Sequence, residues 1–236
     1  MPYLSKIVLN PLRRQAQILL RNPRKLHAAV LAGIAQQPVT ERVLWRVEQR
    51  VHAIDVLALT QSKPAWHHLV EQAGWPNTDD GAPLIAEYEP IMRLISKGRE
   101  FAFRLRANPV VSTRQISKPT PSQAKVLESG ELHRGVRLGH RTAEHQLLWF
   151  LKRAAGENTQ WGFSVGAFET ATVALVARER VQIKKRNETL VVLETATFEG
   201  QLVVTDVDLF TKTVLNGIGS GKAYGCGLLT LAGPRV

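Results

Sequence analysis

The order of strand-like and helix-like patterns in the first 110 residues is the feature that most constrains this fold. Strands show short apolar or alternating runs, whereas helices repeat apolar residues every three or four positions. Four strand patterns and two helical patterns follow one another: strands over residues 3–10, 41–50, 53–62 and 97–109, a helix beginning at Pro23, and a short helix over 63–74. Asn22 is a suitable N-cap for the first helix. The order strand, helix, strand, strand, helix, strand is that of the ferredoxin-like fold.

The strand over 97–109 has two unlike faces. Phe101 and Phe103 share one face, and Arg104 and Arg106 share the other, because side chains alternate across a strand. RNA-binding ferredoxin-like domains stack bases on aromatic side chains of the sheet. Only 6% of the residues are aromatic, which argues against such stacking, and the two phenylalanines fit equally well in the core.

The rest of the chain repeats this order without a visible sequence repeat. After a loop-rich stretch the patterns predict a helix over 142–156, strands over 171–185, 188–200 and 201–207, a helix over 206–217 and a closing strand over 225–233. Glu199 and Gly200 are predicted to form a tight hairpin between two of these strands. The sequence therefore predicts an α+β protein with two tandem ferredoxin-like (RRM-like) β-α-β-β-α-β domains, over residues 1–110 and 111–236.

The chain is strongly basic. Its 31 Lys and Arg outnumber 20 Asp and Glu, so the formal net charge is +11 at pH 7. Such a charge favours polyanionic partners, of which nucleic acid is the most common. A basic protein without such a partner is the alternative. An anionic membrane surface is less favoured, because no basic amphipathic helix stands out.

Cysteine content and hydropathy point to the cytoplasm. Cys226 is the single cysteine, so no disulfide can form within the chain, as in a reducing compartment. The sequence shows no signal-peptide pattern and no run of about 18 apolar residues, so we expect a cytoplasmic protein without a membrane partner. The histidines His140 and His145 do not share a helix face, and with one cysteine we expect no metal site.

The stretch GIGSGKAYGCGLL, residues 217–229, contains five glycines and one lysine. It fails the Walker spacing at Asn216 and Ala223, and it also fails the dinucleotide fingerprint. It follows a predicted helix, whereas nucleotide loops precede one. Two interpretations stay open. One is a helix C-cap followed by a close-packed turn. The other is a backbone nest for RNA phosphates, formed by Gly217, Gly219, Ser220, Gly221 and Lys222.

This glycine stretch, the segment FRLRANP and the opening YLSKIVLNP with Leu26-His27 together resemble the CasE family, the repeat-processing endoribonucleases of type I-E CRISPR systems. The resemblance runs from end to end of the chain. It implies metal-independent cleavage of CRISPR precursor RNA at the 3′ side of each repeat hairpin, which leaves a 2′,3′-cyclic phosphate. It also implies that no small-molecule cofactor is used, and that the protein stays on the hairpin beside the other Cascade subunits.

The resemblance assigns catalysis to His27, which matches the histidine of the family's LH motif. An ordinary pKa of about 6.5 suits a base that takes the 2′-hydroxyl proton or an acid that protonates the 5′-oxygen. Some family members carry a tyrosine three residues earlier, where this chain has Arg24. We expect Arg24 or Lys25 to stabilise the phosphorane instead, and to lower the pKa of His27.

Other basic side chains are candidates for binding RNA. The densest run lies at a predicted strand end and turn: Arg178, Arg180, Lys184, Lys185 and Arg186. We expect this hairpin to bind an RNA stem, because proteins recognise A-form RNA mainly by its shape and by contacts to its phosphates. A solvated hairpin tip is the alternative. Arg13, Arg14 and Arg21 precede the His27 helix and could face the same RNA. The alternative function is a non-catalytic subunit that binds hairpin RNA within a ribonucleoprotein complex.

Overall fold

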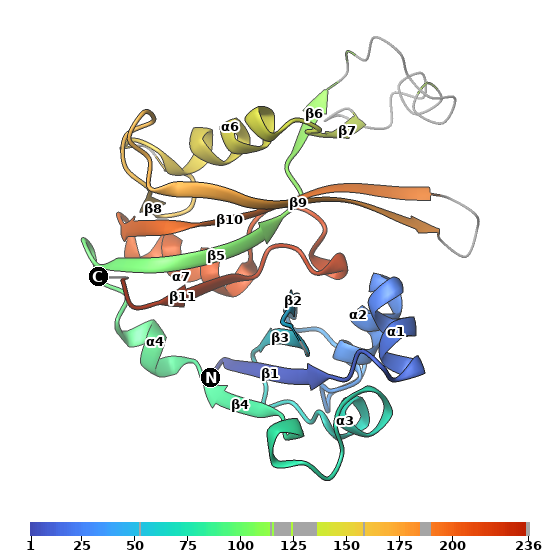
Figure 1. Cartoon of the computed structure of the whole chain (residues 1–236). Coiled ribbons are helices and arrows are strands. Elements are labelled where there is room, and N and C mark those ends of the chain that lie inside the picture. Colours follow the sequence, from blue (N-terminus) through green and yellow to red (C-terminus); the bar gives the residue numbers. More distant parts are fainter. Residues whose placement is uncertain are drawn as a thin grey trace.

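Two antiparallel sheets, each with helices packed on one face, make up the molecule (Figure 1). The structure is a computed structural model that describes residues 1–51, 53–113, 115, 124, 136–157, 159–184 and 190–234, without the side chains of residues 80 and 184. None of the helices in these ranges is long and apolar enough to cross a membrane.

The N-terminal sheet has the strand order β2-β3-β1-β4. Its strands are β1 (Tyr3–Leu9), β2 (Leu44–Gln49), β3 (Ile54–Thr60) and β4 (Leu84–Glu87). Three helices cover one face: α1 (Arg14–Arg21), α2 (Pro23–Leu31) and α3 (His67–Ala73). Their apolar residues, such as Leu19, Leu26 and Leu69, form one buried cluster with Ile7 and Trp45 of the sheet. This is the strand order of a ferredoxin-like half.

The C-terminal sheet has the order β11-β5-β10-β8, and β9 also pairs with β10. Its strands are β5 (Glu100–Ala107), β8 (Phe163–Ser164), β9 (Val173–Lys184), β10 (Leu190–Val204) and β11 (Leu229–Ala232). Helices α6 (Ala143–Ala154) and α7 (Val207–Asn216) pack on it through Phe150 and Phe210, which lie in one buried cluster with Phe103 and Phe198. The phenylalanines of β5 therefore lie in the core, one of the two positions that the sequence leaves open.

Shorter elements connect these parts. They are α4 (Glu89–Arg93) between the sheets, a separate antiparallel pair formed by β6 (Val110–Thr113) and β7 (Val136–Gly139), and the 3₁₀ turns η1 (Asp79–Gly81) and η2 (Lys222–Tyr224). Helix α2 begins where the sequence predicts, and the side chain of Asn22 accepts hydrogen bonds from the amides of Arg24 and Lys25. Helix α1, by contrast, is not among the predicted elements.

The prediction that the strand over 97–109 closes the first sheet is wrong. This strand, β5, pairs with β10 and β11, where it is the first strand of the second ferredoxin-like half. The first sheet is closed instead by β4, a short strand that pairs with β1. A side-chain pattern identifies a strand but not its partner, and four residues are too few to show a clear alternation. We propose that the two halves divide between β4 and β5 rather than at residue 110.

The predicted hairpin at Glu199-Gly200 is also wrong. Strand β10 continues through both residues, and Gly200 pairs with Phe103 on one side and Val173 on the other. A Cβ at position 200 would overlap the carbonyl oxygen of Thr172. The glycine therefore serves a close backbone approach within the sheet, which is the other common reason for glycine in a strand.

The two halves are joined through β2. Leu44 belongs to the core cluster of the C-terminal half, whereas Trp45 belongs to that of the N-terminal half. Arg46, 2% exposed, reaches across: its guanidinium donates to the carbonyl oxygens of Arg104 (2.9 Å) and Leu228 (3.0 Å). The alternation of β2 thus places Trp45 beneath the helices and Arg46 between the halves.

Candidate active site and RNA-binding cleft

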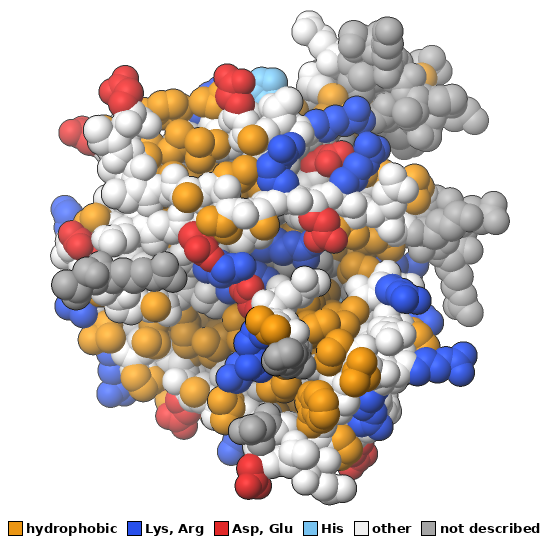
Figure 2. Space-filling model, viewed as in Figure 1, with side chains coloured by type: hydrophobic (Ala, Val, Ile, Leu, Met, Phe, Trp, Pro, Cys, Tyr) orange, Lys and Arg blue, Asp and Glu red, His pale blue; other side chains and the backbone are white. Residues whose placement is uncertain are grey.

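A cleft of about 740 Å³ lies between the two halves. It is bordered by α1, α2 and β2 of the N-terminal half, by β5 and β9 of the C-terminal half, and by Tyr224 of η2. The β9–β10 ribbon extends over α1 and α2 in Figure 1, and Figure 2 shows acidic and basic side chains interleaved along the boundary between the halves. The charged lining residues are Arg21, Arg46, Arg104, Arg106, Arg178, Arg180, Glu48 and Glu179.

His27 lies in the second turn of α2, directly after Leu26, a lining residue of the cleft that is buried in the core. Its imidazole is half-buried. The indole Nε1 of Trp45 donates a hydrogen bond to Nδ1 of His27 at 3.1 Å, and the two rings are stacked with an interplanar angle of 22°. The histidine is therefore held by its helix and by a buried side chain of the neighbouring strand.

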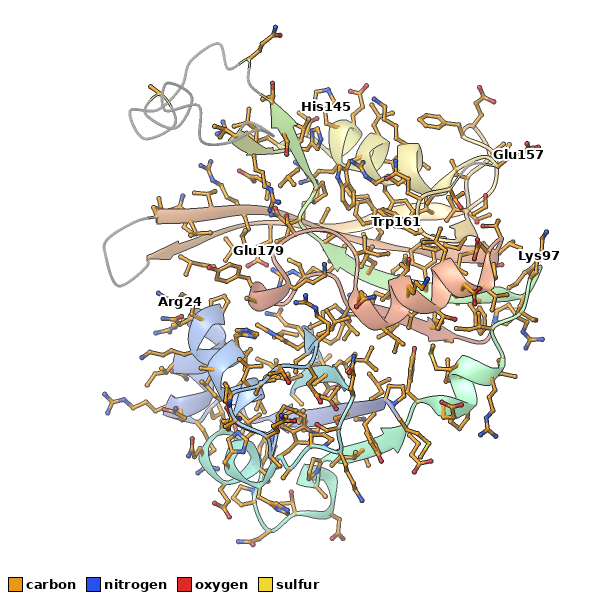
Figure 3. The ribbon with its side chains drawn as sticks, turned by 180° about the vertical axis from the view of Figure 1, so that it is seen from behind. Arg24, Lys97, His145, Glu157, Trp161 and Glu179 are labelled. Carbon is orange, nitrogen blue, oxygen red and sulfur yellow. The ribbon has the colours of Figure 1, made fainter. Side chains whose placement is uncertain are left out.

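Burial lowers the pKa of His27 below its ordinary value, so the neutral imidazole is favoured. The predicted direction of this shift is confirmed, but its cause is desolvation rather than the charges of Arg24 and Lys25. Both of these side chains are exposed, and neither forms an ion pair with a described residue. Figure 3 shows Arg24 at the end of α2 that faces β9, the strand of Glu179.

The glycine-rich loop lies against His27's helix, although the two are roughly 200 residues apart in sequence. Its turn η2 contacts both α2 and β2. All five of its glycines have positive φ, which non-glycine residues rarely adopt. A Cβ at Gly225 would lie 2.8 Å from the Trp45 ring, and one at Gly217 would lie 2.7 Å from Leu44. The loop is thus packed closely on β2.

Several hydrogen bonds hold the loop in place. Nζ of Lys222 donates to the carbonyl oxygen of Gly219 at 2.9 Å. The pKa of this amine is lowered mainly by burial, and also by the positive charge of Arg42. Ser220 bonds to Asn108 of the C-terminal half. Gly217 ends α7 at φ +74°. These contacts favour the close-packed turn, and the role of Gly217, Gly219, Ser220, Gly221 and Lys222 toward RNA stays a prediction.

The structure brings some of the predicted basic residues to the cleft and leaves others elsewhere. Arg21, Arg178 and Arg180 line it. Arg178 donates to the side chain of Gln146 and to the carbonyl oxygen of Arg141, and Arg180 lies 3.5 Å from Glu194. Of the others, Arg14 is exposed at the start of α1, and Arg13 donates to the carbonyl oxygen of Gly74 at 3.2 Å. The side chain of Lys184, and Lys185 and Arg186, lie outside the described residues.

The ion pairs of the cleft are not predicted by the sequence. Glu48 lies 2.6 Å from Arg46 and 3.0 Å from Arg104, which also pairs with Glu199. Arg106 pairs with Glu179 at 2.6 Å. The shared face of Arg104 and Arg106 is visible in the alternation of their strand, but their partners come from other strands. Trp45 and Tyr224 are also unpredicted, because no local pattern connects them with His27.

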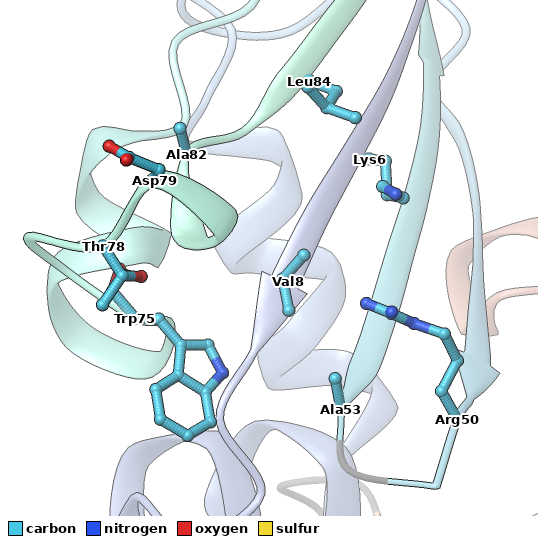
Figure 4. Close-up of a pocket in the computed structure, with 9 residues that line it drawn as sticks. All are labelled: Lys6, Val8, Arg50, Ala53, Trp75, Thr78, Asp79, Ala82 and Leu84. Carbon is cyan, nitrogen blue, oxygen red and sulfur yellow. The ribbon is translucent and has the colours of Figure 1, made fainter.

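A second hollow, of about 590 Å³, lies beside β1 and β4 of the N-terminal sheet (Figure 4). Lys6, Val8 and Arg50 line it together with Trp75, which points toward it from the segment before η1. None of the predicted site residues in the described ranges borders this hollow. The predicted site residues that line a hollow, Arg21, Arg178 and Arg180, therefore line the cleft.

In the part of the chain that the structure describes, the other polar groups form no metal-binding cluster. Among the described residues no three His, Cys, Asp or Glu side chains are grouped as metal ligands would be. Cys226 is fully buried, and burial raises the pKa of its thiol to about 11, so it is an unreactive core residue.

Comparison with known proteins places these features in one family. A family model described as "CRISPR associated protein" matches residues 2–233. The CRISPR-associated endoribonuclease Cse3 of Thermus thermophilus is 28% identical over 98% of this chain and 99% of its own. The CRISPR system Cascade subunit CasE of Escherichia coli is 26% identical, with 98% of each chain covered.

Solved structures agree with the fold. Cse3 bound to a 19-nucleotide RNA has a TM-score of 0.71 at 26% identity, with 98% of each chain covered. Cse3 of Thermus thermophilus bound to an RNA that represents a pre-cleavage complex has a TM-score of 0.70, again with 98% of each chain covered. The tandem ferredoxin-like fold is therefore confirmed.

Proposed function

Because this chain belongs to the CRISPR-associated protein family, in its CasE (Cse3) branch, we propose that it is the endoribonuclease that cuts CRISPR precursor RNA at the 3′ side of each repeat hairpin. The observation that carries the proposal is His27, half-buried in α2 beside a cleft lined by arginines. The alternative, a non-catalytic hairpin-binding subunit, would need the cleft but not this histidine.

The proposed reaction is a transesterification. The 2′-oxygen attacks the neighbouring phosphorus, the bond from phosphorus to the 5′-oxygen breaks, and the products carry a 2′,3′-cyclic phosphate and a 5′-hydroxyl. One proton leaves the 2′-hydroxyl and one joins the 5′-oxygen; His27 would take part in one of these transfers. Arg24 and Lys25, exposed one turn or less from His27, would stabilise the negative charge of the phosphorane.

The cleft would bind the stem of the hairpin. Its width is set by α1 and α2 on one side and by β9 on the other, and arginines line both sides. Such an arrangement suits the phosphates of A-form RNA, which is recognised by shape and backbone contacts. Retention of the product hairpin beside the other Cascade subunits is part of the same proposal.

Incubation with a cognate repeat hairpin in excess EDTA tests the proposal directly. We expect full cleavage at one position, with a cyclic phosphate on the 5′ fragment and a hydroxyl on the 3′ fragment, identified by mass spectrometry. Loss of cleavage in EDTA that Mg²⁺ restores would indicate a metal nuclease. Tight binding without any cleavage would favour the non-catalytic alternative.

Reversing the charge of a cleft arginine should weaken RNA binding in a salt-dependent way. Arg180→Glu and Arg21→Glu are each expected to reduce the slope of log affinity against log salt by about 0.7–0.9 for every phosphate that the variant no longer neutralises. Lys97→Glu is the matched control, because Lys97 is exposed at the opposite end of the molecule from Arg24 (Figure 3). Equal slopes for all three variants would place the RNA outside the cleft.

A further inference from the structure

The buried side chain of Trp45 lies between His27 and the glycine-rich loop. It is 1% exposed and points from β2 toward the helices. Its indole bonds to His27 on one side and meets Gly225 of the glycine-rich loop on the other. A single buried side chain therefore contacts both the loop and the histidine.

The direction of this hydrogen bond decides where His27 carries its proton. An indole N–H can only donate, so Nδ1 of His27 must accept and holds no proton. A neutral imidazole bears one proton, and the bond made by one ring nitrogen sets the state of the other. Neutral His27 therefore carries its proton on Nε2, to which no described residue forms a hydrogen bond.

The glycine-rich loop limits where the indole can lie. Gly225 has a φ of +77°, a value that favours glycine. Its backbone comes so close that a Cβ there would lie 2.8 Å from Cζ3 of Trp45. Any side chain at 225 would push the indole away from the loop, so the glycine allows the ring to occupy the place from which it reaches His27.

From these contacts we propose that Trp45 is a positioning residue for His27: it orients the imidazole and selects the tautomer with the proton on Nε2, while Gly225 keeps the indole in place. The inference rests on the proposed function, because it affects cleavage only if His27 acts on RNA.

This tautomer bears on both roles left open for His27. With the proton on Nε2, that nitrogen is ready to donate a hydrogen bond to a phosphate or leaving-group oxygen. Accepting the 2′-hydroxyl proton at Nε2 would require the other tautomer, in which Nδ1–H faces the indole N–H. The RNA-free protein is thus prepared to donate this hydrogen bond. A role as base, or as an acid in the doubly protonated form, would place a proton on Nδ1 and would first break the bond to Trp45.

The first test uses the RNA-free wild-type protein, so it does not depend on a variant that folds. Nitrogen-15 NMR distinguishes protonated from unprotonated imidazole nitrogens at about pH 8, where a histidine with an ordinary pKa of about 6.5 is neutral. We expect Nδ1 of His27 to be unprotonated and Nε2 protonated. The opposite tautomer, or an equal mixture, would overturn the proposal whatever the activity.

The second test compares Trp45→Phe with Trp66→Phe. Both tryptophans are 1% exposed in the same core cluster, but Nε1 of Trp66 has no hydrogen-bond partner among the described residues. Trp45→Phe should give a mixture of His27 tautomers and slow single-turnover cleavage roughly 5- to 10-fold, as expected when one neutral hydrogen bond is removed. Trp66→Phe should change neither. Equal slowing in both variants, with an unchanged tautomer, would reduce Trp45 to a packing role and reject the proposal.

His27→Ala distinguishes failure of this inference from failure of the proposed function. If His27→Ala cleaves as fast as wild type, the catalytic assignment is wrong, and the tautomer measurement still decides whether Trp45 orients the ring. If His27→Ala is inactive while Trp45→Phe keeps the wild-type rate and tautomer, the positioning role alone is rejected.

Discussion

His27→Ala is expected to slow cleavage of a cognate repeat hairpin by roughly 10²–10⁴-fold, the usual contribution of one general acid or base. RNA affinity should stay close to that of wild type, because the side chain is half-buried against Trp45 and the arginines of the cleft are untouched. Single-turnover cleavage with enzyme in excess measures the chemical step, and equilibrium binding to a hairpin with a 2′-deoxy nucleotide at the cleavage position measures affinity.

His67→Ala is the matched control for this experiment. His67 is exposed at the start of α3 and lines neither of the two hollows described above. It should cleave and bind like wild type. Wild-type cleavage by His27→Ala, or an equal loss in both variants, would contradict the assignment of catalysis to His27.

Arg46→Met is expected to lower the free energy of unfolding by about 3–5 kcal/mol, the usual cost of removing one member of a buried ion pair. Methionine keeps much of the apolar stem but none of the donors. The carbonyl oxygens of Arg104 and Leu228 and the hydroxyl of Thr230 would lose partners at 2.9–3.0 Å, and Glu48 would lose its ion pair with Arg46. Urea unfolding followed by tryptophan fluorescence measures the change.

Arg93→Met provides the comparison. Arg93 is exposed on α4 and pairs with Glu89 four residues earlier, an arrangement that contributes little to stability. Its unfolding curve should nearly overlay that of wild type. If Arg46→Met unfolds at the same urea concentration as Arg93→Met, the contacts of Arg46 between the halves do not stabilise the protein.

Most elements of the fold could be predicted because their signals are local. The apolar run of β1 and the N-cap of α2 at Asn22 act over a few residues, and the structure has both. The partner of a strand is not a local property. For that reason the alternation of β5 predicts its two faces correctly but not the sheet to which it belongs. The prediction at Gly200 failed for a related reason, since its neighbour Thr172 comes from another segment.

The candidate site could likewise be predicted only in part from the sequence. His27, Arg24 and Lys25 could be named from one short motif and its resemblance to a family. The ion pairs of the cleft could not, because Glu48 and Arg104 come from different halves. For the glycine-rich loop the sequence leaves a close-packed turn and an RNA contact open. The structure packs the loop against Trp45 and α2, and its contact with RNA stays a prediction.

The sequence by itself determined the fold class, the basic charge and the histidine, because propensity, net charge and motif are properties of residues and their near neighbours. Only the tertiary structure decided what surrounds His27. Packing of the halves brings β2, the glycine-rich loop and α2 together and buries the imidazole, which lowers its pKa. It also places Trp45 where its N–H meets Nδ1, and such long-range contacts arise from burial of shared apolar surface rather than from any sequence pattern.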